Sequence, residues 1–436
     1  MEYDFQKTYR LRQWSPLIHF QSEQSGATLR GTEVKPKFDR FIFWKYEKRG
    51  IQIPDKWKIN GRKTALNYKL SINCSDVDII RIGSGEYGIY YANMGIRDEN
   101  EKIKGVWSDS VYVTITCFIP ELMETIDNMA EEFFIVTNFG AMQDKGFGSF
   151  TLGEEVPSGG KVSICLREVS GANKCYSFVC EETMKHHNNE FRAIKTIYSL
   201  MKSGINHGSS KYARSLLFRF MHERFCISNE KAYLKHIGMA PAVGEAYHQR
   251  PIESYTYDDT GFYVRALLGV ADHLYFQNMP LTGCEKEELR AIKMDLEELA
   301  NNKNKNSEEK ERDLKSRERN LKRRNKDKTI IDISGERIKR LSSPIFFKVI
   351  GNNVYFVGFR INDDIYSEKF TFTPERSSEN NSFIPARPVV LEVPSKEILG
   401  EGFIDDFLEY AVDLIEREEK SKFKKELGED FQIKEV

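Results

Sequence analysis

Residue types suited to binding an anion gather in the segment Asn138–Phe150, N-F-G-A-M-Q-D-K-G-F-G-S-F. Gly146 and Gly148 allow backbone conformations closed to other residues. Successive amide N–H groups in such a loop can form an anion-binding concavity. Gln143 and Lys145 would add an amide and a positive charge for phosphate or ribose oxygens. The alternative is a glycine-rich turn between strands, with its phenylalanines in the core.

A second candidate segment, S-G-A-T-L-R-G-T-E-V-K-P-K-F-D-R, gathers Arg30, Lys35, Lys37 and Arg40 near an expected helix start. Amide N–H groups at a helix N-terminus point outward and favour anions. Aromatic residues interleave with these cations, a combination that suits single-stranded nucleic acid because cations bind phosphates and rings stack on bases. The alternative is a solvated charged helix face above a core stripe.

A third segment, Gly204–Ser215, G-I-N-H-G-S-S-K-Y-A-R-S, contains Lys211 and Arg214. These two cations could contact phosphates in the same way, and an ordinary loop between helices is the alternative.

Signatures of nucleophilic catalysis are absent from the sequence, which has no G-x-S-x-G, Walker or H-E-x-x-H motif. His19, at the end of an early strand, and His222, on an expected helix, could act as general acid or base toward a ribose hydroxyl. Asp39 lies among basic residues and could act beside them or simply form a salt bridge. A structural role is the alternative for each of the three.

Four metal-ligating residues lie close together in C-Y-S-F-V-C-E-E-T-M-K-H-H, namely Cys175, Cys180, His186 and His187. The C-x4-C spacing is loose, and an alternating strand would place the two cysteines on opposite sides. We therefore predict no metal site and no cofactor.

The whole-chain composition restricts the class of protein. The chain has 436 residues, 40% of them hydrophobic and 30% charged, with a formal net charge of -1, so any basic surface must be local. Seven cysteines show no paired spacing, and the first residues do not form a signal peptide. Apolar runs are too short to cross a membrane. We expect a soluble, cytoplasmic protein.

The elements that would position these residues follow the order strand, helix, two strands, helix, strand. A strand is expected near Arg12–Gln21, followed by a helix with Pro36 in its first turn. Two alternating strands and a helix beginning at Pro120 come next. The apolar run Phe133–Thr137 is expected to form the last strand, directly before the glycine-rich loop. This βαββαβ order is typical of a ferredoxin-like domain.

The remainder of the chain alternates between expected strands, helices and one charged segment. Lys161–Val169 reads as an alternating strand, and two β-rich runs around G-N-N after Ser343 predict a hairpin. The segment 301–330 is expected to be a charged helix or mobile insertion, because it has little apolar surface. We predict an N-terminal domain at 1–182, a helical region at 183–300, this insertion, and the rest of the second domain at 331–436.

Several short motifs together resemble the RAMP superfamily of CRISPR effector subunits, and most closely the first subunit of the type III-B Cmr complex. They are the loop K-G-F-G-S-F, the strand opening R-I-K-R-L-S-S-P-I-F-F-K-V-I (Arg337–Ile350), P-L-I-H-F, G-A-T-L-R-G-T-E-V-K-P and F-Y-V-R-A-L-L-G-V-A. The resemblance implies an α+β protein with two fused ferredoxin-like (RRM-like) domains and helical insertions.

The resemblance also implies a role in binding CRISPR RNA, target RNA or both, alongside other effector subunits. We expect RNA contacts from Arg30, Lys35, Lys37, Arg40, Gln143, Lys145, Gly146, Gly148, Lys211 and Arg214. The leading interpretation is a subunit that binds RNA without cleaving it. The alternatives are an endoribonuclease on the same fold, using His19, Asp39 or His222, and a scaffold that does not touch RNA.

Overall fold

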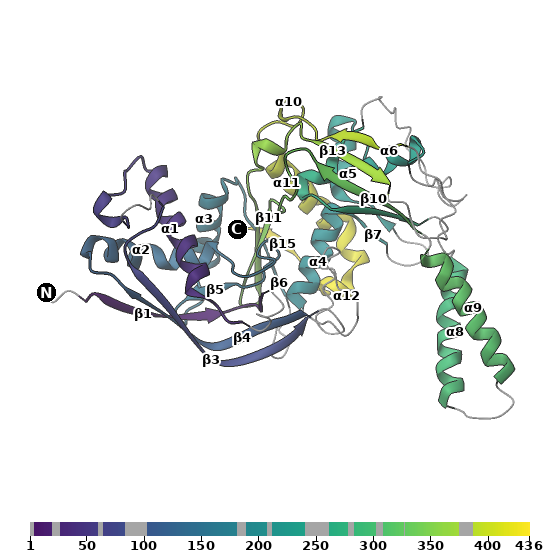
Figure 1. Ribbon diagram of the computed structural model, residues 1–436, viewed down its shortest axis with the longest axis horizontal. Helices are drawn as coiled ribbons and strands as arrows, with labels where there is room; N and C mark the ends of the chain where they lie inside the picture. The colour runs from purple at the N-terminus through teal and green to yellow at the C-terminus, as the bar shows by residue number, and fades with distance from the viewer. Residues whose placement is uncertain are drawn as a thin grey trace. The chain divides into compact units, whose positions relative to one another are not determined.

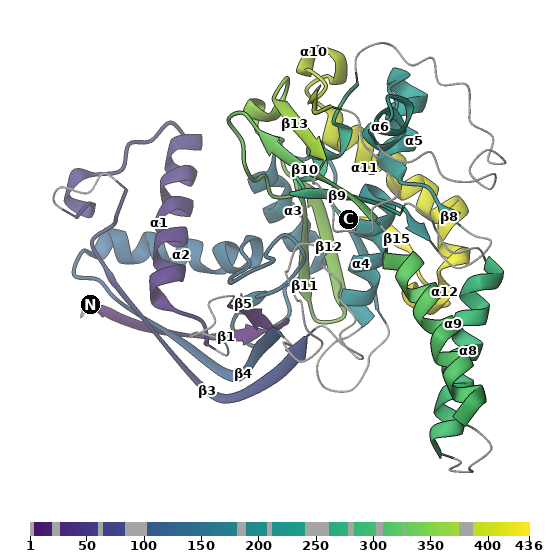
Figure 2. The same cartoon turned by 45° about the vertical axis from the view of Figure 1, so that its right-hand side comes forward.

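The computed structural model describes residues 4–19, 27–59, 64–82, 103–180, 189–206, 212–239, 261–277, 283–301, 308–326, 328–374 and 387–436 (Figures 1 and 2). The chain is an α+β protein with several antiparallel sheets, as expected. It divides into two compact units. The first comprises Met1–Tyr198, Ser343–Arg360 and Ile404–Val436, and the second comprises Ser199–Ser342 and Ile361–Phe403. The domain boundaries expected from the sequence remain a prediction.

The first unit begins with one sheet and its covering helices. These elements are β1 (Gln6–Gln13), β2 (Leu17–Ile18), α1 (Gly31–Lys48), β3 (Lys69–Ile82), β4 (Ile103–Thr116), α2 (Pro120–Val136), β5 (Phe150–Leu152) and α3 (Gly159–Ser170). A short 3-10 turn, η2 (Asp55–Trp57), lies between α1 and β3.

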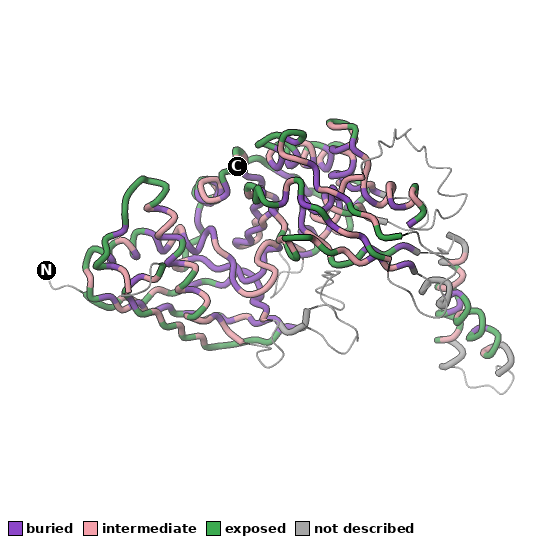
Figure 3. The backbone as a smooth tube through the Cα atoms, turned by 45° about the horizontal axis from the view of Figure 1, so that its top comes forward, coloured by how far each residue is buried: buried purple, intermediate pink, exposed green. Residues whose placement is uncertain are grey.

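The sheet of these strands is antiparallel throughout, with β5 beside β1, β1 beside β4, and β4 beside β3, while β2 pairs with the start of β4. Exposed residues alternate along β1 with residues that are partly or fully buried, as the two-residue period of a strand requires (Figure 3). Leu11 faces the core, whereas Arg10 and Arg12 face outward. One face of the sheet is therefore apolar and the other is polar.

Helices α1 and α2 cover the apolar face of this sheet (Figure 1). Phe38 of α1 stacks on Phe133 of α2 with ring centroids 4.5 Å apart, and both side chains are almost completely buried. Val111 and Val113 of β4 belong to the same apolar cluster. Burying such side chains stabilises the fold by about 1.5–3 kcal/mol each, so this helix–sheet contact fixes α1 firmly in place.

Two strands expected from the sequence are helices in the structure, and one helix starts earlier than expected. Phe133–Thr137 is not a strand, because Phe133–Val136 forms the last turn of α2, which is buried on every side. Lys161–Val169 lies within α3, which begins at the capping residue Ser158 and ends at Gly171 in the left-handed region. Helix α1 begins at Gly31, so Pro36 lies beyond its first turn. The glycine-rich loop therefore follows a helix and precedes β5.

A second sheet of the first unit brings distant parts of the chain together. Its order is β11 (Ile345–Ile350), β12 (Asn353–Gly358), β6 (Tyr176–Val179) and β15 (Ile433–Glu435), all antiparallel. The β11–β12 hairpin around Gly351 is confirmed. The C-terminal elements α11 (Phe403–Leu414), the π-helical turn η6 (Ile415–Glu419), η7 (Lys420–Lys422) and α12 (Lys424–Leu427) precede β15. Helix α4 (Asn189–Lys202) runs from the first unit into the second.

The second unit contains a four-stranded antiparallel sheet in the order β14, β13, β10, β9. Its elements are β7 (Ile205–Asn206), β8 (Tyr212–Ala213), α5 (Leu216–Phe225), α6 (Glu230–His236), η3 (Val264–Leu268), β9 (His273–Gln277), α8 (Gly283–Asn301), α9 (Glu308–Lys326), β10 (Lys328–Gly335), η5 (Asp363–Ile365), β13 (Lys369–Pro374), β14 (Val389–Glu392) and α10 (Lys396–Leu399).

The charged segment after residue 301 contains helix α9, which packs against α8 (Figure 1). Ile292 of α8 and Leu314 and Leu321 of α9 are buried together. The two helices connect neighbouring strands, because Gln277 at the end of β9 pairs with Lys328 at the start of β10. The α8–α9 pair is therefore an excursion between two adjacent strands.

Candidate nucleic-acid interface

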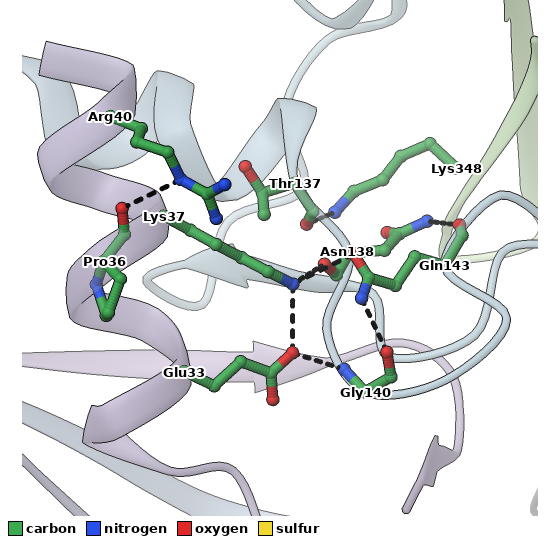
Figure 4. A network of polar contacts seen from close by, with 9 residues as sticks. All are labelled: Glu33, Pro36, Lys37, Arg40, Thr137, Asn138, Gly140, Gln143 and Lys348. Carbon is green, nitrogen blue, oxygen red and sulfur yellow. Dashed lines mark hydrogen bonds and ion pairs between the residues drawn. The ribbon is translucent and has the colours of Figure 1, made fainter. Parts of the chain in front are cut away.

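Two of the segments singled out in the sequence meet at Lys37 (Figure 4). Its Nζ donates to Oε1 of Glu33 at 2.9 Å, to the carbonyl of Asn138 at 3.0 Å and to Oε1 of Gln143 at 2.9 Å. Glu33 Oε1 also accepts from the amide of Gly140 at 2.7 Å. A lysine ammonium has three donors, and all three of Lys37 are used. Helix α1 and the glycine-rich loop are thus joined by one charged network.

The electrostatics of Lys37 reflect its enclosure, since its side chain is only 18% exposed. Burial lowers the pKa of Lys37, the Glu33 carboxylate opposes that shift, and the charge of Arg40 adds to it. The ammonium also lies 4.8 Å from the ring centroid of Phe139. Lys37 therefore fixes the loop and has no donor left for a phosphate.

Lys35 and Asp39 join α1 to the segment before β3. Lys35 Nζ lies 2.7 Å from Asp39 Oδ2, 2.9 Å from the carbonyl of Leu66 and 4.1 Å from the ring centroid of Tyr68. Asp39 is 3% exposed and also accepts from the amide of Leu66. This pair stabilises the position of α1 against the chain.

Arg30 and Arg40 are the two arginines at the N-cap and near the midpoint of α1, respectively, and they differ in exposure. Arg40 is exposed, its Nε donates to the carbonyl of Pro36, and within the described residues it forms no ion pair (Figure 4). Arg30 is half-buried at the N-cap of α1 and gives the helix no side-chain cap. The first amides of α1 then carry the positive end of the helix dipole beside the Arg30 guanidinium.

His19 lies near the same end of α1, since Glu33, Arg30 and Lys37 all act on its charge. Burial is the largest effect and lowers the pKa of His19, and Arg30 and Lys37 lower it further. Glu33 and a backbone hydrogen bond at Thr28 oppose the shift. The imidazole is therefore mainly neutral at pH 7.

The glycines of the loop are required by the protein's own backbone. Gly140, Gly146 and Gly148 have φ angles of 76°, 83° and 65°, in the region that favours glycine. A Cβ at Gly148 would lie 1.9 Å from the carbonyl oxygen of Phe139. A Cβ at Gly146 would meet Val349 at 3.0 Å. The close approaches at Gly146 and Gly148 are thus made by other parts of the same unit.

Strand β11 holds the loop from the side opposite α1. Asn138 Nδ2 donates to the carbonyl of Phe347 at 2.9 Å, and Ser149 Oγ donates to that of Val349 at 2.6 Å. Lys348 is fully buried, and its Nζ donates to the carbonyls of Phe134, Thr137 and Phe150 at 2.8, 2.9 and 3.1 Å. Burial lowers the pKa of Lys348 well below its usual value.

Lys145 lies inside the protein, where it is 6% exposed. Its Nζ is 2.7 Å from Asp144 Oδ2 and 3.4 Å from the ring centroid of Tyr198. The neighbouring Phe147 is completely buried and stacks on Phe191 with centroids 4.3 Å apart. This part of the loop packs into the core, as the structural alternative for the phenylalanines predicts.

The remaining sequence candidates belong to other parts of the chain. Arg214 lies before α5 and His222 lies on α5, both in the second unit and both half-buried. Lys211, His186 and His187 lie outside the described residues. His19 and Asp39 belong to the first unit.

Three residues of this network, Glu33, Asn138 and Lys348, were not recognised in the sequence. Only Lys348 carries a local signal, because it is a single lysine within the apolar strand Ile345–Ile350. No local sequence pattern marks Glu33 or Asn138. Their importance comes from hydrogen bonds with residues far along the chain.

Cys175 and Cys180, considered above as metal ligands, are buried thiols without a disulfide. Burial raises the pKa of Cys175 to about 12, which favours the protonated thiol over the thiolate that zinc requires. Among the described residues, no group of three or more histidine, cysteine or acidic side chains could hold a metal ion. In the same part of the chain, no helix is long and apolar enough to span a membrane.

Comparison with known proteins assigns the class of this chain, a RAMP-type subunit of type III-B CRISPR interference complexes. The chain belongs to the Cmr1 family. The family model of the Cmr1 N-terminal domain matches residues 5–205, and that of the Cmr1 C-terminal domain matches residues 212–435. Together they span nearly the whole sequence. No curated protein matches the chain.

Proposed function

We propose that this Cmr1-family chain is an RNA-binding subunit of its interference complex in the cytoplasm, and contacts guide or target RNA with the N-terminal half of α1 and the adjoining loop. The observation that supports this proposal most directly is the network at Lys37, which joins α1 and the glycine-rich loop into one surface. Lys37 and Gln143, which bond to each other in this network, are 106 residues apart in the sequence. Because hydrogen bonds hold this surface in one conformation, its cations have fixed positions. Fewer side chains and loop residues then lose conformational entropy when RNA binds.

Within this surface, we assign phosphate contacts to Arg30 and Arg40. Arg40 is exposed, and Arg30 stands at the helix N-terminus, where an anion is also favoured by the dipole. Arginine forms bidentate hydrogen bonds to phosphate. Lys35, Lys37 and Lys145 hold the surface in shape, and Gly146 and Gly148 allow the loop to pack. Lys211 and Arg214 remain proposed contacts of the second unit.

The strand order of the first unit supports a ferredoxin-like arrangement for this half of the protein. The order β5, β1, β4, β3 with helices α1 and α2 on one face arises from a βαββαβ sequence of elements. We propose the same origin for the sheet of β11, β12, β6 and β15, because its strands have the equivalent order, with α4 between β6 and β11 and α11 between β12 and β15. The sheet of the second unit differs, since its strands β9, β10, β13 and β14 lie side by side in chain order. Because a fold alone does not establish function, the RNA proposal rests on the surface at α1.

Titration of labelled single-stranded RNA with the purified protein at several salt concentrations tests this proposal. We expect the protein to bind this RNA. The logarithm of the observed association constant should fall linearly with the logarithm of salt concentration, with a slope of about -0.7 for each phosphate contact. Absence of binding at low salt would favour the scaffold alternative.

The same RNA, incubated with and without a divalent metal ion, tests the alternative of an endoribonuclease. We expect full-length RNA to persist. Cleavage that disappears in His19→Ala, Asp39→Ala or His222→Ala would overturn the interpretation of binding without catalysis.

A further inference from the structure

The outward face of the first unit's sheet carries a hollow of about 420 Å³. This face is the one opposite α1 and α2 (Figure 1). The volume lies within the range of about 300–1,000 Å³ that is usual for small-ligand sites. The side chains that matter here are those of Arg10, Arg12, Trp14, Trp107, Asp109 and Glu154.

Arg12 is held in this hollow on an aromatic base. The carbon of its guanidinium lies 4.1 Å from the ring centroid of Trp14, which is itself 4% exposed. Trp14 is fixed by a 2.7 Å hydrogen bond from its Nε1 to Oγ1 of Thr151. Arg12 Nη1 also donates to the carbonyl of Glu154 at 3.2 Å. The guanidinium is thus pre-oriented, and Arg12 as a whole remains exposed to solvent.

Opposite charges line the same hollow. Arg10 forms an ion pair with Glu154, and both side chains remain substantially exposed at 45% and 72%. Asp109 accepts a 3.2 Å hydrogen bond from Nε1 of Trp107. The hollow therefore offers cations, carboxylate acceptors and aromatic surface within one small volume.

We propose that this hollow binds one unpaired nucleotide of single-stranded RNA. The base stacks on the exposed face of the Arg12 guanidinium, because bases stack on arginine planes as well as on aromatic rings. Arg10 is placed to contact a phosphate, and Glu154 and Asp109 to accept hydrogen bonds from exocyclic amino groups of the base. The charge pattern favours RNA over a protein partner, since cation, acceptor and flat surface each have a counterpart in one nucleotide.

This inference rests on the proposed RNA-binding function and adds a second contact on the opposite face of the sheet from α1. A strand of RNA held at α1 alone would be held by its phosphates, which carry no base information. A stacked nucleotide adds sensitivity to the presence of a base. The two contacts can therefore be separated by removing bases from the probe.

The test compares labelled oligoadenylate with an oligonucleotide of equal length whose sugars are abasic, using the full-length protein. Arg12→Ala should weaken oligoadenylate binding by about tenfold or more, the order expected for loss of one stacked base. Arg12→Lys should recover only part of this loss, because it restores the charge without the plane. For the abasic probe, Arg12→Ala should differ from the parent only by the effect of one charge.

Lys7→Ala is the matched control, since it removes one cation of β1 that pairs with Asp127, on the side of α2. It should leave the preference for oligoadenylate over the abasic probe unchanged. Far-ultraviolet circular dichroism checks that each variant is folded.

Parental binding of oligoadenylate by Arg12→Ala would overturn the nucleotide site. If Arg40→Ala still weakens binding in that case, the proposed function stands without this subsite. If the parent binds neither probe, the proposed function itself fails. If Arg12→Ala retains RNA affinity but no longer co-purifies with co-expressed effector subunits, the hollow is a protein contact and the proposal is wrong.

Discussion

Lys37 on α1 donates to Oε1 of Gln143 at 2.9 Å, although the two residues are 106 positions apart. The same ammonium pairs with Glu33, which in turn accepts from the Gly140 amide. One lysine thus couples the orientation of the basic helix to the conformation of the loop. The RNA surface that we propose depends on this coupling, because Arg40 lies one turn further along the same helix.

Lys37→Met should destabilise the protein by about 1–3 kcal/mol, because it leaves Glu33 and the carbonyl of Asn138 without their shared donor. Urea denaturation measures the loss. Adding Glu33→Gln to Lys37→Met should recover part of the lost stability, because the amide removes the unpaired negative charge. The effects of these two substitutions on the free energy of unfolding should therefore be non-additive.

Lys7→Met is the control, because Lys7 forms a partly exposed ion pair with Asp127. Its effect should stay within about 1 kcal/mol. Equal stability of Lys37→Met and the parent would show that the network contributes nothing to the loop.

Gly148→Ala should be severely destabilising, by more than about 3 kcal/mol, because it combines a left-handed backbone with a clash. The φ angle is 65°, and the added Cβ would lie 1.9 Å from the Phe139 carbonyl. Gly153→Ala is a matched control with a φ of 75° and no neighbour within 4 Å. It should cost only the backbone strain of about 1 kcal/mol. Equal melting temperatures for the two variants would contradict the packing at Gly148.

Local patterns were sufficient to predict several elements of this protein. Helix α1 and the hairpin of β11 and β12 were predicted because spacing and turn residues act over a few positions. Phe133–Thr137 was wrongly predicted as a strand, because a five-residue apolar run does not distinguish a strand from a fully buried helix end. In Lys161–Val169 the helical spacing of Val162, Cys165 and Leu166 was overlooked in favour of alternation.

The candidate site was predictable only in part. Both basic and glycine-rich segments were recognised from composition, yet the sequence did not indicate that they meet. The partners of Lys37 in the glycine-rich loop lie about a hundred residues away, and those of Lys348 lie about two hundred residues earlier. Burial of Lys145 against Tyr198 likewise depends on tertiary packing that no local pattern encodes.

Removing residues 278–327 and joining Gln277 to Lys328 through an Asn-Gly turn should preserve the melting temperature of the remaining protein. Those two residues are paired in adjacent antiparallel strands, so a two-residue hairpin can replace the excursion. Removing Asn301–Lys328 alone should be worse, because α8 would lose the partner that covers Ile292. Differential scanning calorimetry and light scattering measure stability and aggregation. If the protein that lacks 278–327 were less stable than the one that lacks Asn301–Lys328, the packing of α9 on α8 would be contradicted.

His19 should make stability fall as the solution is acidified. Its folded-state pKa is lowered below the unfolded value of about 6.5, so the unfolded chain binds the proton more readily in the window below that value. The contribution of His19 to the free energy of unfolding is complete above about pH 6.5, the pKa in the unfolded chain, and it declines as the pH falls toward the folded-state pKa. His19→Gln should show a shallower decline between about pH 7 and pH 5 in urea titrations. Identical pH profiles for the variant and the parent would contradict the lowering of the His19 pKa by its half-buried environment.

The central claim is that α1 and the adjoining loop bind RNA through Arg30 and Arg40. The most direct measurement is the salt dependence of single-stranded RNA affinity for the double variant Arg30→Ala, Arg40→Ala. Its logarithmic salt slope should be shallower than that of the parent by about 1.4, corresponding to two phosphate contacts. Lys48→Ala, Arg49→Ala is the matched control, which removes two cations at the C-terminal end of the same helix and should leave the slope unchanged. If the first variant retains the parental slope and affinity, the RNA-binding surface does not lie on α1.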